Sequence, residues 1–241
     1  MSACEALSFE ASPNPSESHL DPLNSPYPLP WGWLIGNQNR VATAGISLRS
    51  YYRTESLISP DGRYATYSRI QTQLFPDFTQ SQVSSILFLE DLNSGDLHTI
   101  TAASPLSKNR FNSNAASIPG SITILIPVAW SETGDRMLAR EFESLFGTDL
   151  ASDYAVIWDR RSNQTHTVTP TQIEYTHAVL MGWSQSSPQH VLFQAGQVGD
   201  ERQSLWQVDQ LGNTIAAIAD DQPIVYGKTV TYTWTGPQAY R

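Results

Sequence analysis

The chain has 241 residues, a formal net charge of −9 and a pI near 4.9, and only 15% of its residues are charged. Such an acidic chain lacks the positive field that general nucleic-acid binding, or attraction to an anionic membrane, requires. Cys4 is its single cysteine, which excludes a disulfide within the chain, and no apolar stretch is long enough to span a membrane. Because no basic region precedes an apolar run at the N-terminus, we expect no secretory signal and a cytoplasmic protein.

Residues 1–30 are predicted to form a disordered tail. Six Ser and six Pro fall there among few large apolar side chains, a composition that cannot build an ordered core. Residues 31–241 are predicted to form a single domain. At the boundary, Trp31 and Trp33 stand in the aromatic run YPLPWGWLIG. Two interpretations stay open: these rings lie against the domain and close a gap in it, or the run is a docking peptide for a partner.

The stretch SPDGRYATYS, residues 59–68, predicts a tight turn followed by a strand. Pro60 fixes φ at the second turn position, Asp61 can accept hydrogen bonds from nearby backbone N–H groups, and Gly62 permits the positive φ that closes the turn. After Arg63 the residues alternate with a period of two and are rich in β-branched and aromatic types, which is typical of a strand.

Weaker copies of this unit recur twice downstream, and each is followed by a predicted hairpin. The turn serines are separated by 72 and 53 residues, so insertions fall in the earlier units. Four strands per unit at a spacing near 50 residues are typical of propeller blades. The aligned positions are the turn serines Ser59, Ser131 and Ser184, the residues before them, Ile58, Trp130 and Trp183, and the hairpin aspartates Asp91, Asp159 and Asp209. We therefore expect Trp130 and Trp183 to be buried beside their turns.

This order of strands and turns resembles the TolB-like, WD-repeat-like β-propeller repeats over about residues 54–218. The first copy is close, the second has Glu132 and Thr133 in place of Pro and Asp, and the third keeps only Ser184. The resemblance implies an all-β fold: a small β-propeller-like array of three four-stranded blades. Three blades are fewer than propellers usually have, so a fourth blade from both termini, residues 41–48 and 225–234, would close the ring. A two-sheet sandwich is the alternative architecture.

No motif predicts catalysis, and we expect no cofactor and no metal. The nearest approach to a nucleophile elbow, GWSQS at residues 182–186, lacks its last glycine and belongs to the repeat turn. The five histidines show no metal-binding spacing. Only Glu55, Glu174 and His177 offer polar chemistry in or near the leading strand of a repeat. We therefore expect a protein that is not an enzyme.

Two aromatics stand between two guanidinium groups in the stretch LRSYYRTES, as Arg49, Tyr51, Tyr52 and Arg53. Tyr and Arg are enriched where proteins bind one another. With Trp31 and Trp33, these four residues are the predicted contacts for a protein partner. The competing interpretation is that one Tyr packs inward and the others are ordinary surface.

The prediction for function is a non-catalytic protein–protein interaction or scaffold protein built on propeller repeats. The alternative is a propeller that binds a small ligand or peptide, or an accessory domain of a hydrolase, acting through a central funnel.

Overall fold

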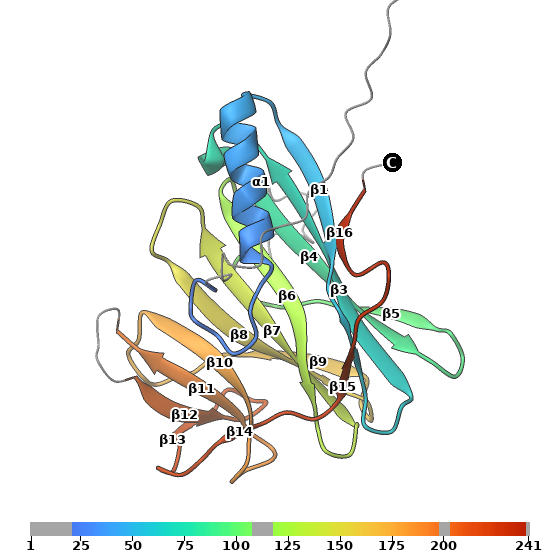
Figure 1. Ribbon diagram of the computed structural model, residues 1–241. Helices are drawn as coiled ribbons and strands as arrows, with labels where there is room; N and C mark the ends of the chain where they lie inside the picture. The colour runs from blue at the N-terminus through green and yellow to red at the C-terminus, as the bar shows by residue number, and fades with distance from the viewer. Residues whose placement is uncertain (1–20, 108–117, 198–202, 240–241) are drawn as a thin grey trace, which may run out of the picture.

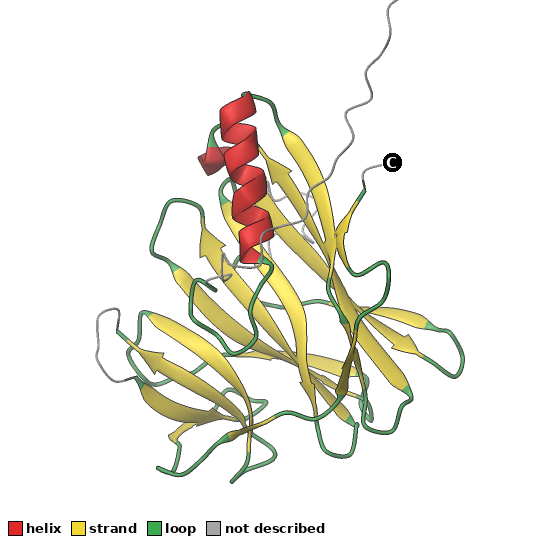
Figure 2. Cartoon of the chain, in the orientation of Figure 1, coloured by secondary structure: helices red, strands yellow, loops and turns green. Residues whose placement is uncertain are grey.

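The computed structural model describes residues 21–107, 118–197 and 203–239. Strands are the main regular structure of this part of the chain, which also contains one α-helix and a short 3-10 helix, η1 (Phe78–Gln80) (Figure 2). The predicted all-β class is therefore confirmed.

Three antiparallel meanders of four strands follow one another along the chain (Figure 1). They coincide with the three repeats expected from the sequence. The first meander contains β2 (Ser56–Ile58), β3 (Tyr64–Leu74), β4 (Gln82–Asp91) and β5 (Leu97–Ile100). The second contains β6 (Ser121–Trp130), β7 (Arg136–Leu145), β8 (Ala151–Asp159) and β9 (Gln164–Val168). The third contains β10 (His177–Ser184), β11 (Val191–Gly196), β12 (Ser204–Val208) and β13 (Thr214–Ala216).

The first two meanders join in one larger sheet, and the third forms a separate sheet. The junction lies between β4 and β6, where Val83 pairs with Ile122 in parallel register and the Ser85 hydroxyl accepts a hydrogen bond from the backbone N–H of Leu125 at 2.6 Å. A further strand, β1 (Leu48–Arg53), pairs with the second half of β3 and so continues the line of β2. The first meander is thereby lengthened well beyond β2.

The turn serines of the first two meanders have the same structural role. The Ser59 hydroxyl accepts a hydrogen bond from the backbone N–H of Tyr64 at 2.9 Å and donates to Asp61 at 2.6 Å. The Ser131 hydroxyl accepts from the backbone N–H of Arg136 at 3.0 Å and donates to Asp135 at 2.7 Å. Each serine therefore ties its turn to the strand that follows it.

The third turn serine obtains its carboxylate from a distant part of the chain. Ser184 donates to Asp221 at 2.7 Å, and Asp221 also accepts a hydrogen bond from the side-chain amide of Gln207 at 2.7 Å. The third turn has no Asp of its own to accept the hydrogen bond of its serine, as Asp61 and Asp135 do in the first two turns. The C-terminal segment supplies the missing carboxylate, which explains how this turn keeps its serine after losing the rest of the motif.

The C-terminal segment then crosses the ends of all three leading strands. Ile224 pairs with Trp183, Tyr226 with Trp130, and Lys228 with Ile58. Its partners are the three residues that precede the turn serines. Every second residue of the C-terminal segment meets one of them, because alternate residues of an extended chain have equivalent orientations. Figure 1 shows the segment, in orange to red, running from the smaller sheet along the larger one. Its strands are β14 (Pro223–Ile224), β15 (Lys228–Val230) and β16 (Gly236–Gln238), and β16 pairs with β1.

The termini therefore do not build a fourth four-stranded meander within the described residues. Residues 41–44, expected to begin a strand, belong instead to helix α1 (Trp31–Ala44), which begins after Pro30 and ends at Gly45, where φ is +66°. Leu34 and Val41 of this helix are buried in an apolar cluster with residues of the large sheet. Figure 1 shows α1 lying across the upper part of that sheet. Burial of this apolar side outweighs the strand-like alternation of residues 41–48.

Residues 21–30 differ from the predicted tail because they pack into the domain. The Asp21 carboxylate accepts hydrogen bonds from the backbone N–H groups of Leu23 at 3.0 Å and Leu29 at 3.1 Å. The Tyr27 hydroxyl donates a hydrogen bond to the carbonyl oxygen of Met181, on β10 of the third meander, at 2.8 Å. Residues 1–20 of the predicted tail, and Cys4 with them, lie outside the described residues.

Successive meanders pack face to face. One apolar cluster lies between the first and second meanders, another between the second and third, and a third lies under α1. Trp130 is 0% exposed in the first of these clusters and Trp183 is 2% exposed in the second. The predicted burial of both tryptophans is confirmed.

Candidate functional surface

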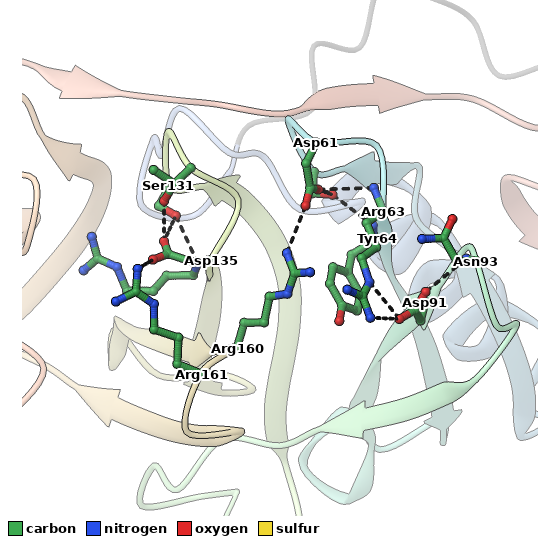
Figure 3. Close-up of polar contacts among 12 residues, drawn as sticks. Asp61, Arg63, Tyr64, Asp91, Asn93, Ser131, Asp135, Arg160 and Arg161 are labelled. Atoms are coloured by element: carbon green, nitrogen blue, oxygen red, sulfur yellow. Dashed lines mark hydrogen bonds and ion pairs between the residues drawn. The ribbon is translucent and has the colours of Figure 1, made fainter.

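Charged residues near the turns of the first two meanders are paired with one another (Figure 3). Arg160 contacts Asp61 at 2.9 Å and thereby links the second meander to the first. Arg63 contacts Asp91 at 2.9 Å, and the hydrogen bond from Arg63 lowers the pKa of the Asp91 carboxyl. Figure 3 shows the ring of Tyr64 between Arg63 and Arg160, whose guanidinium carbons lie 5.2 and 4.9 Å from its centroid. These contacts stabilise turns and a meander junction.

A second ionic group is buried where the N-terminal segment meets the second meander. Arg140 contacts Asp21 and Asp153 at 2.7 Å each, and Arg140 also donates to the carbonyl oxygen of Tyr27 at 2.6 Å. One guanidinium cannot neutralise two buried carboxylates. Burial raises the pKa of Asp153 to about 6, even though Arg140 opposes the shift. All three side chains are almost completely inaccessible, so this group holds the fold together and has no route to a ligand.

Three of the six predicted contact residues pack inward. The ring of Trp33 lies 5.2 Å from that of Tyr52, and the ring of Trp31 meets Phe142 edge-on at 5.9 Å. Burial raises the pKa of Tyr52, and Glu55 adds to the shift. These rings border the apolar cluster under α1, which agrees with the interpretation that the tryptophans lie against the domain.

The other three predicted residues lie on the opposite face of the sheet, because successive side chains of a strand alternate. Arg53 is only 6% exposed: its guanidinium carbon lies 3.8 Å from the centroid of Tyr67, and it donates to the hydroxyl of Ser56 at 3.1 Å. Arg49 is exposed and donates to the side-chain oxygen of Gln73 at 2.9 Å, while Tyr51 is half-buried. The six residues therefore do not form one surface.

Sequence reasoning missed the aromatic neighbours of Arg53 and Arg69. Phe88 of β4 stacks on Tyr67 of β3 at 5.4 Å, and the guanidinium carbon of Arg69 lies 5.9 Å from the Phe88 ring. On the other side of Arg53, Tyr232 stacks on Trp234 at 5.0 Å. The only signal in the sequence was the alternation of residues 64–70, which does not reveal the partner strand. We call this surface the open face: Arg49, Tyr51, Tyr67, Arg69, Ile86, Phe88 and Trp234.

The outward side chains of the open face lie outside the apolar core of the described residues. None of the three apolar clusters there includes these outward side chains. Ile86 is 43% exposed and Trp234 is 55% exposed. The opposite face of the same strands is covered by the second meander and by α1. Within the described residues, the open face is therefore the side of the first meander that no apolar cluster covers.

Two of the three polar residues expected near a funnel have partners of their own. Glu55 accepts a hydrogen bond from Thr231, His177 contacts Gln203, and Glu174 is exposed. Within residues 21–107, 118–197 and 203–239, no three or more His, Cys, Asp or Glu side chains gather to hold a metal. No helix in those ranges is long and apolar enough to cross a membrane.

Comparison of the chain with protein-family models and with curated proteins finds no match.

Proposed function

We propose that the chain is a non-catalytic protein-binding domain that contacts its partner through the open face. Arg49 and Tyr51 are the members of this face that the sequence predicted. A cytoplasmic location remains part of the proposal.

We also propose that the three meanders are blades of a TolB-like propeller. Their face-to-face packing supports this, as does the repeated role of Ser59 and Ser131 at the start of the second strand. The C-terminal strand meets Ile58, Trp130 and Trp183 at equivalent positions, as expected where leading strands converge on one axis. A partner in the central funnel is disfavoured, because this strand lies across those three positions.

The exposure of Ile86 and Trp234 beside arginine side chains carries the proposal of protein binding. Exposed apolar and aromatic groups mixed with Arg are typical of interface anchors. Rings stacked in a row are also rigid, so they lose little conformational entropy when a partner covers them.

Site-specific photocrosslinking in the protein's own cells tests the proposal. A benzophenone amino acid replaces Ile86 in one variant and Ile215 in the other; Ile215 is 54% exposed but lies on β13 of the third meander. We expect a light-dependent adduct with another protein at position 86 and none of that size at position 215. Equal labelling at both positions, or no protein adduct at position 86, would overturn the proposed surface.

A further inference from the structure

We propose that the open face binds an acidic, extended segment of a partner protein. The inference rests on the proposed function and adds the chemistry of the partner. It starts from Arg49 and Arg69, two exposed arginines of this face that form no ion pair with a described residue.

Three arginines near the turns have carboxylate partners among the described residues, whereas Arg49 and Arg69 of the open face have none there. Arg63, Arg160 and Arg161 each form an ion pair with an Asp. No ion pair among the described residues involves Arg49 or Arg69, and the hydrogen bond of Arg49 goes to a neutral amide. Both side chains are exposed. In a chain of net charge −9, two exposed arginines without carboxylates favour a ligand that brings its own.

The spacing of the arginines fits an extended chain. Arg49 and Arg53 are four residues apart on β1, about 13 Å at the rise of a strand, and Arg69 is the register partner of Arg53. Acidic side chains four residues apart in an extended segment point to the same side and span the same distance. The two acidic side chains would lie over Arg49 and Arg69. The side chain of the residue midway between them in the segment would lie over Tyr51.

The surface between and beside the arginines is suited to aromatic or apolar side chains of the same segment. Phe88 and Ile86 face outward on β4, opposite Tyr67 and Arg69 of β3. Acidic residues alone would leave these groups in water, so we infer a segment in which acidic and aromatic residues are combined. An Arg can contact a carboxylate and an aromatic ring at the same time, which Lys does less well.

Fluorescence anisotropy with defined peptides tests the inference on the full chain. The probe is a labelled, end-capped peptide of twelve residues that repeats Glu-Ser-Tyr-Ser, so that Glu residues four apart and the Tyr midway between them share one side of the extended chain. Matched peptides carry Gln or Lys in place of Glu. We expect the Glu peptide to bind at least about tenfold more tightly than the Gln peptide, and Arg69→Ser to remove about tenfold of that affinity. Arg69→Lys should restore part of it.

Arg161→Ser is the matched control, because Arg161 is exposed but lies at the β8–β9 turn beside Asp135. It should leave the affinity unchanged, and all variants should melt like the parent. The inference is overturned if the Gln peptide binds as well as the Glu peptide, or if Arg161→Ser weakens binding as much as Arg69→Ser. It is also overturned if heparin or polyuridylate binds as tightly as the Glu peptide, because that result would indicate a general polyanion-binding surface. A protein adduct at position 86 with any of these results would leave the proposed function intact and refute only the acidic partner.

Discussion

Replacing Asp21 with Ala should destabilise the protein strongly, although Asp21 stands in a stretch whose composition predicts disorder. The substitution removes one of the two carboxylates that pair with buried Arg140. Breaking a buried pair from one side costs about 3–5 kcal/mol, because a buried charge loses its partner. Arg140 keeps Asp153 and the carbonyl oxygen of Tyr27. We therefore expect the lower end of that range, about 3 kcal/mol.

The loss should also involve the backbone of the N-terminal segment. Asp21 accepts hydrogen bonds from the backbone N–H groups of Leu23, Ser25 and Leu29, so its removal leaves three backbone N–H groups without that partner. For a chain of this size, 3 kcal/mol corresponds to a fall in Tm of about 6–12 °C.

Urea unfolding followed by tryptophan fluorescence, with calorimetry for the Tm, would measure both quantities. Asp220→Ala is the control: Asp220 is exposed, so its replacement should change the free energy of unfolding by less than about 0.5 kcal/mol. A loss of less than about 1 kcal/mol for Asp21→Ala would refute the reasoning. Residues 21–30 would then behave as the tail that their composition predicts.

Three further predictions concern stability. Burial raises the pKa of the Asp153 carboxyl to about 6, above its value of 3.8 in the unfolded chain. Ionisation of this carboxyl therefore disfavours folding. Its contribution to stability is fully present below pH 3.8 and is lost as the pH rises through 6. Between pH 4.5 and 7.5 the parent should therefore lose about 2 kcal/mol relative to Asp153→Asn in parallel urea titrations, and a constant difference would contradict the raised pKa. Trp130→Ala should cost about 3–5 kcal/mol in denaturant unfolding, and a cost under about 1 kcal/mol would show that this ring does not support the core. Ser184→Ala and Asp221→Ala should each lower the free energy of unfolding by about 1 kcal/mol. The double variant should lose clearly less than the sum of the two, because the two side chains share one hydrogen bond. Additive losses would contradict that contact.

Features that depend on residues close together in the chain were predictable from the sequence. The Ser59 turn, the strands that follow each turn and the hairpins were predicted because their signals lie within a few residues of one another. The burial of Trp130 was also predictable, since its place before a turn serine recurs along the chain. Even the inward packing of one Tyr from the pair at 51 and 52 followed from strand alternation, as the competing interpretation of that stretch had it.

Contacts between distant strands determine which Tyr points inward and what surrounds the other. Tyr52 faces α1 and Tyr51 faces outward because β1 pairs with β3 in one particular register, and register depends on strands that are distant in sequence. The same holds for the row of rings on the open face, where Tyr67 meets Phe88 across two strands.

Contacts across long stretches of sequence account for the remaining differences. Asp221 serves a turn 37 residues earlier, and Asp21 serves Arg140 from 119 residues away. Composition identifies residues 21–30 as poor in apolar groups and therefore unable to fold alone. It carries no information about a buried guanidinium elsewhere in the chain, and the need of that charge for a carboxylate is what places those residues inside the domain.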